Sequence, residues 1–83
     1  MIFSGKKNWR ITLEGRDIAA NKRFLQNIWV DATTEEDARK AAIAALSQAQ
    51  AHFASVVEIG RRKSNFKMLP GGTFAEGRIY FDA

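Results

Sequence analysis

The chain has 83 residues, no cysteine and a formal net charge of +4 at pH 7. This length predicts a single domain, residues 1–83, and the lack of cysteine excludes disulfides and thiolate metal sites as supports for its small core. No apolar run is long enough for a signal peptide or a membrane span, so we expect a cytoplasmic protein (host cytoplasm if phage-encoded) with no membrane partner.

Positive charge is concentrated outside the helix predicted over residues 33–53. That segment holds three acidic and two basic residues, whereas the rest of the chain holds six acidic and eleven basic residues. An excess of cations on strands and loops favours an anionic partner, either nucleic acid or an acidic protein surface. Solubility of a small domain is the alternative explanation for this charge.

The first predicted strand covers residues 8–14. Trp9, Ile11 and Leu13 alternate there with polar residues, which is the period of two expected when one face of a strand is buried. Residues 15–23 form a polar connection that is too long for a two-residue hairpin. We therefore expect a mobile flap or a longer hairpin loop at this point.

The second predicted strand covers residues 24–31. Ile28 and Val30 should face the core of the protein. The opposite face of the sheet then receives Leu25, Asn27 and Trp29.

A helix is predicted from Thr33 to Phe53. Thr33 and Glu36 have the spacing of a capping box, and the acidic residues of the first turn complement the helix dipole. Small side chains recur at helical spacing and should let the helix lie close to a sheet. This stripe consists of Ala38, Ala41, Ala42, Ala45, Leu46 and Ala49.

The third predicted strand covers residues 54–62, with Val57 and Ile59 on one face and Val56 and Glu58 on the other. A turn should follow at residues 69–72, where proline precedes two glycines as in a type II turn.

Residues 78–81 alternate again and predict a fourth strand. The predicted fold class is α+β, with the two-layer order β-β-α-β-β. One helix packs on a mostly antiparallel sheet of three to four strands. The connection through the helix allows a right-handed parallel crossover, and the strand order stays open.

Residues suited to catalysis are scarce, so we predict a protein that is not an enzyme and needs no cofactor or metal. His52 is the only histidine, and it is expected near the helix C-terminus as a satisfied or partly buried structural residue. The acidic residues at 35–37 are explained by their place in the first helical turn.

A binding surface is predicted on the sheet face away from the helix, where Arg10, Trp29 and Tyr80 combine charge with aromatic rings. Such groups stack on bases, contact phosphates or anchor protein interfaces. Three alternatives remain: homodimerisation through this face, cover by residues 66–74, or a register error of one residue.

The strongest predicted electrostatic site is a basic cluster between the third strand and the turn. Arginine suits bidentate contacts with phosphate or carboxylate, and lysine adds a point charge. The cluster consists of Arg61, Arg62, Lys63 and Lys67, to which Lys6–Lys7 and Lys22–Arg23 are possible additions.

The junction from strand to capped helix at residues 30–41 resembles that of small phage and mobile-element proteins, several anti-CRISPR proteins among them. The resemblance implies a stoichiometric inhibitor that docks on a CRISPR surveillance complex and blocks DNA access. Many such inhibitors are acidic DNA mimics, whereas this chain is basic. It is therefore expected to bind acidic protein patches, guide RNA or DNA. The resemblance assigns no functional role to individual residues of this chain.

The expected function is that of a non-catalytic, phage-type inhibitor docking on a bacterial nucleoprotein complex through the basic and aromatic surface. One alternative is a DNA- or RNA-binding accessory protein. Another is a structural homodimer.

Overall fold

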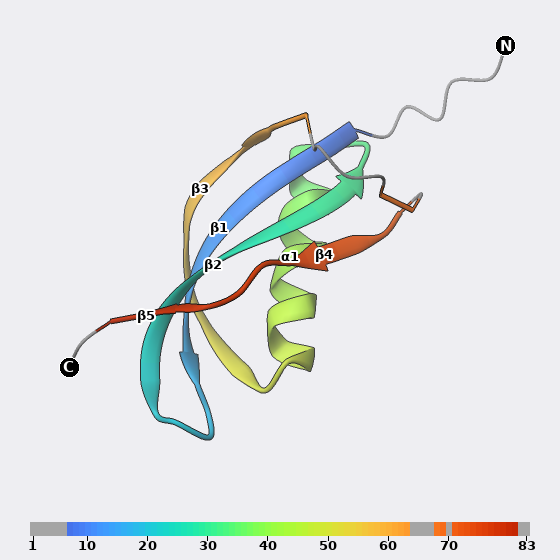
Figure 1. Ribbon diagram of the computed structural model, residues 1–83. Helices are drawn as coiled ribbons and strands as arrows, with labels where there is room; N and C mark the ends of the chain where they lie inside the picture. Colours follow the sequence, from blue (N-terminus) through green and yellow to red (C-terminus); the bar gives the residue numbers. More distant parts are fainter. Residues whose placement is uncertain (1–6, 64–67, 70, 82–83) are drawn as a thin grey trace, which may run out of the picture.

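The computed structural model describes residues 7–63, 68–69 and 71–81, and it has one helix packed on one face of a sheet (Figure 1). This is the predicted α+β architecture, with short strand β4 in addition to the predicted strands. The elements are β1 (Lys7–Asp17), β2 (Lys22–Ala32), α1 (Glu35–Gln48), β3 (Ala51–Arg61), β4 (Thr73–Ala75) and β5 (Ile79–Tyr80).

The sheet has the order β3-β1-β2-β4, and β5 pairs with a second stretch of β2. Every pair of neighbouring strands is antiparallel. Because β2 and β3 both run antiparallel to β1, they run parallel to each other, and α1 connects them across β1. The predicted parallel crossover is therefore present. We call the sheet face that α1 covers the inner face, and the opposite one the outer face.

The core lies between α1 and the inner face, and its residues match the predicted alternation. Ile11, Leu13 and Ile28 are at most 1% exposed, as are the helix residues Ala38, Ala42 and Leu46. The small helix side chains allow a close approach to the sheet. The core cluster is completed by Trp9, Phe24, Val30, Ala32 and Ala51.

Gly15 marks the tightest point of this packing. A Cβ atom there would lie 2.9 Å from the backbone oxygen of His52 and 3.1 Å from side-chain atoms of Leu46 and Phe24. Only glycine fits between β1, β3 and the helix without displacing backbone.

The β1–β2 connection is shorter than predicted, because β1 continues to Asp17 and β2 begins at Lys22. The remaining four residues form a hydrogen-bonded turn, in which Asn21 has φ 53° and its N–H donates to the Asp17 carbonyl at 2.8 Å. Ile18 N–H donates to the Gln50 carbonyl at 3.1 Å. The connection is therefore a hairpin loop of four residues, the second of the two predicted alternatives.

Both predicted ends of the helix need correction. The N-cap is Thr34, whose hydroxyl accepts the N–H of Asp37 at 3.1 Å, so the cap lies one residue beyond Thr33. The helix ends at Gln48, and Gln50 with φ 59° turns the chain into β3. Helices often end at a glycine with positive φ, but here Gln50 adopts that conformation, so the sequence does not mark the end of the helix.

Strand β3 has two register shifts, and one of them overturns the predicted faces of Val56 and Val57, whereas Ile59 and Glu58 lie on opposite faces as predicted. Val56 lies opposite Leu13 and packs against the core, whereas it was predicted beside Glu58 on the other face. Glu58 lies opposite Thr12, so Val57 is an extra bulge residue, and it is 56% exposed. A bulge breaks the period of two, which is why alternation alone gives the wrong face.

The turn at residues 69–72 has the features predicted for it where the structure describes them; Pro70 lies outside the described residues. Gly72 N–H donates to the Leu69 carbonyl at 2.9 Å, and Gly71 has φ 70°. Asp31 anchors this turn to the end of β2, because its carboxylate accepts the Gly71 N–H at 2.8 Å.

Candidate anion-binding site

Arg10 and Trp29 are directly opposite each other in the β1–β2 register and share the outer face, as predicted. Tyr80 does not join them. It lies opposite Phe24, which faces the core, and the two rings meet edge to face at 5.8 Å. The prediction for Tyr80 was wrong, because the two-residue strand β5 turns Ile79 outward and Tyr80 inward.

Trp29 is on the outer face but is not open to a partner. Its side chain is 8% exposed, and its indole N–H donates to a carboxylate oxygen of Glu76 at 2.6 Å. Phe74 on β4 lies opposite it in register. Phe74 therefore extends the sheet beside Trp29, and cover of this face by residues 66–74 stays a prediction. Base stacking on Trp29 loses its support.

Carboxylates compensate most arginines of the outer face. Arg10 and Arg62 approach the same oxygen of Glu58, at 3.4 and 3.8 Å. Arg23 pairs with Glu14 at 3.7 Å. The centre of this face is therefore close to neutral, although the chain as a whole is basic.

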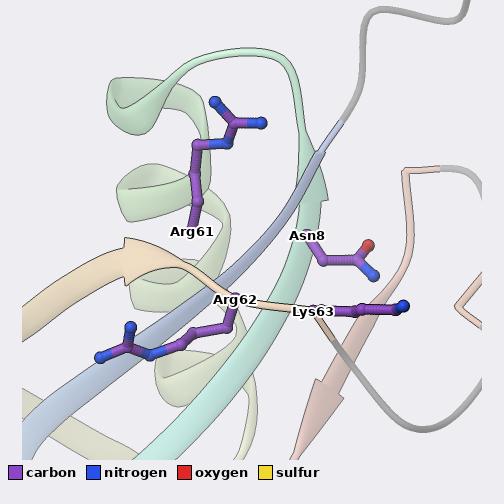
Figure 2. Close-up of a pocket in the computed structure, with 4 residues that line it drawn as sticks. All are labelled: Asn8, Arg61, Arg62 and Lys63. Atoms are coloured by element: carbon purple, nitrogen blue, oxygen red, sulfur yellow. The ribbon is translucent and has the colours of Figure 1, made fainter.

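Cations with fewer carboxylate partners among the described residues instead gather where β3 ends. Figure 2 shows the side chains of Arg61, Arg62 and Lys63 spreading in different directions around an open pocket that Asn8 also lines. Arg61 lies opposite Trp9 in register and so points to the inner side, whereas Arg62 N–H bonds to the Asn8 carbonyl at 3.1 Å. We call this group of four residues the basic end.

The electrostatics of the basic end favour an added anion. Within the part of the chain that the structure describes, neither Arg61 nor Lys63 has a carboxylate within 4.0 Å. Arg62 has only Glu58, which it shares with Arg10. Guanidinium groups present paired donors to phosphate or carboxylate, and the ammonium group adds a point charge.

The other bases predicted for the cluster are divided between this end of the sheet, the opposite end and the residues that the structure does not describe. Lys6 and Lys67 lie outside the described residues, and Lys7 begins β1 at this end of the sheet. Lys22 and Arg23 begin β2, whereas residue 32 at its other end pairs with Lys7. An eleven-residue strand is about 35 Å long, so these two bases form a separate group.

A second polar cluster escaped prediction because its members are 61 and 63 residues apart in sequence. Arg78 donates to the same oxygen of Asp17 at 2.6 Å that accepts the Tyr80 hydroxyl at 2.8 Å. Arg78 also donates to the Ala49 carbonyl at the end of α1, at 2.7 Å, and lies 4.4 Å from the Phe24 ring centre. We call these residues the Asp17 cluster.

Hydrogen bonds and charge lower the pKa of Asp17 from its ordinary value. The backbone N–H of Ala20 has the largest effect, followed by the Tyr80 hydroxyl, and the charge of Arg78 acts in the same direction. Each partner favours the ionised carboxylate. This cluster is thus internally satisfied.

His52 was predicted at the C-terminus of the helix, and this prediction was wrong. It is exposed on β3 and lies opposite Arg16. Among the described residues, no three His, Cys, Asp or Glu side chains are grouped as a metal site would require. The described helix is too short and too polar to cross a membrane.

Comparisons with protein-family models, curated proteins and solved structures found no match to this chain.

Proposed function

We propose that this chain is a non-catalytic binding protein of phage type that docks on a bacterial nucleoprotein complex of the CRISPR kind. The observation that carries the proposal is the position of Arg61 and Lys63, which hold no ion pair within the described residues, beside Arg62 at one end of the sheet. Such a complex presents both guide RNA and acidic protein surfaces, so it offers the anionic groups that this site fits.

The charge pattern supports docking by the basic end rather than by the outer face. On the outer face, Arg10 and Arg23 already have carboxylate partners. An anionic partner would have to compete with these internal pairs. At the basic end the same partner meets Arg61 and Lys63, which have no competing carboxylate within the described residues, so electrostatic attraction is less opposed.

Protection of a plasmid from CRISPR interference tests the proposal. Cells with an active system and a matching target plasmid should keep the plasmid when they express the chain. Arg61→Gln with Lys63→Gln should abolish this protection, because the double variant removes two cations that hold no ion pair within the described residues.

The matched control is Arg39→Gln with Lys40→Gln, which removes the same charge from helix side chains that pair with Glu35 and Glu36. It should protect as well as the unaltered chain does. Equal loss of protection in both double variants would show that only the net charge of the chain matters. Absence of protection against every CRISPR type tried would sink the proposal.

Direct nucleic-acid binding is the second candidate, favoured by arginine and lysine side chains arranged around one open pocket. A gel shift with duplex DNA should then weaken with salt at a log–log slope of about −0.9 per phosphate neutralised. The Arg61→Gln, Lys63→Gln variant should flatten that slope by about two such units. Duplex DNA and RNA that stay unbound at low salt would exclude this candidate.

A further inference from the structure

An apolar row runs along the outer face beside the edge of the sheet. Phe74 and Ile79 are 50% and 65% exposed, and each lies opposite a β2 residue of the same face. At the end of the row, Arg23 lies 5.2 Å from the ring centre of Phe81. The row consists of Leu25, Phe74, Ile79 and Phe81.

The charges around the apolar row narrow the choice of occupant. Arg23 pairs with Glu14, Arg10 and Arg62 share Glu58, and Glu76 adds a further carboxylate beside Trp29, so this face adds little to the positive charge of the chain. A polyanion would gain little here. Two copies of a +4 chain would meet least repulsion through this face, and the Arg–Glu pairs of one copy offer both signs of charge to the other.

We propose that the outer face binds a second copy of this chain, sheet against sheet, in a two-fold dimer centred on the apolar row. In such a dimer one patch meets itself, so each row contact occurs twice. Face-to-face sheets pack about 10 Å apart, a separation that side chains of this size fill. A small domain also gains apolar burial that it cannot obtain alone.

This dimer leaves the basic end accessible. Arg61 ends β3, which is separated from β2 by β1, whereas the apolar row follows β2, β4 and β5. Arg61 also points to the inner side (Figure 2). Each dimer would therefore present two basic ends.

Analytical ultracentrifugation of the full chain tests the dimer from micromolar to near-millimolar concentration. The mass should rise from 9.3 kDa towards twice that value. Ile79→Glu should weaken dimerisation at least about tenfold, by placing charge in the apolar row. Ile18→Glu is the matched control, since Ile18 is 53% exposed at the hairpin tip and the same exchange there should change nothing.

Circular dichroism should show both variants folded, because both replaced side chains are exposed. High salt should leave the dimer intact, because apolar contact rather than ion pairing holds it. A mass of 9.3 kDa at every concentration would overturn the dimer. Equal effects of the two variants on dimerisation would also overturn it. So would a monomer that binds a single-stranded oligonucleotide, if Ile79→Glu abolishes that binding.

Discussion

The two ends of the sheet use arginine in opposite ways. At the hairpin end, Arg78 is 16% exposed in its side chain and is held by Asp17, by the Ala49 carbonyl and by the face of Phe24. At the other end, Arg61 is exposed and has no ion pair within the described residues. The same guanidinium group is structural in one place and available in the other.

This contrast separates a cluster that stabilises the fold from the basic end, where we propose that a partner binds. The Asp17 cluster joins the hairpin, the end of α1 and strand β5, so it fixes elements that lie far apart in sequence. At the basic end, Arg61 and Lys63 hold no ion pair within the described residues. Substitutions at the first should therefore change folding, and substitutions at the second should change binding.

The largest effect is expected for Phe24→Ala. Phe24 is fully buried, lies beneath Arg78 and meets the Tyr80 ring edge to face. Loss of its ring should destabilise the domain by about 3–5 kcal/mol. Urea unfolding monitored by circular dichroism measures this change. Phe24→Leu keeps most of the buried area and should be clearly milder, and equal losses would show that the ring contacts contribute little.

Acid should weaken the hairpin end through Asp17. Its pKa is lower in the folded chain than in the unfolded chain, so its contribution is complete above the unfolded pKa of roughly 3.9. The contribution is then lost as the pH falls through the lower folded pKa.

Melting temperatures from pH 7 down to pH 2 measure this effect. Asp17→Asn should lower the melting temperature at neutral pH and flatten the acid limb of the profile. Glu36→Gln, in the exposed pair with Lys40, should keep the original slope. An unchanged slope in Asp17→Asn would show that Asp17 does not cause the loss of stability in acid.

A smaller loss is expected at the helix N-terminus, which lies at the same end of the molecule as the basic end (Figure 1). Thr34→Ala removes the hydroxyl that accepts the Asp37 N–H, and it should cost about 1 kcal/mol. Thr33→Ala should cost almost nothing. Thermal unfolding of the two variants compares them, and the reverse ranking would place the cap where the sequence first suggested it.

The smallest change in stability is expected for Arg61→Gln with Lys63→Gln. Because neither side chain holds an ion pair within the described residues, the free energy of unfolding should stay within about 0.5 kcal/mol. Denaturant titration checks this. A loss comparable to that of Phe24→Ala would show that both ends are structural.

The sequence predicts the parts of the fold that follow simple periods. Ile11 and Leu13 alternate with polar residues and are buried, as is Ile28 on the next strand. The alanine stripe of the helix packs where predicted except at Ala49, which is exposed just after the helix end. The bulge at Val57 and the helix end at Gln50 escape prediction, because each breaks a period without a glycine or proline to mark it.

The candidate site was predicted only in part, for a related reason. The three bases at residues 61–63 are neighbours in the chain, so sequence alone brings them together. Glu58 is only four residues from Arg62, but its second contact, with Arg10 across 48 residues, cannot be read from the sequence. Neutralisation of the outer face depends on such long-range pairs, which only the register reveals.

The most direct measurement is an NMR titration of the isotope-labelled chain with a short DNA duplex as a polyanionic probe. The account predicts that the largest amide shifts fall on Asn8 and on residues 61–63, with little change on the outer face. Shifts centred on Lys22 and Arg23 at the hairpin tip, or spread evenly over all cationic residues, would contradict it.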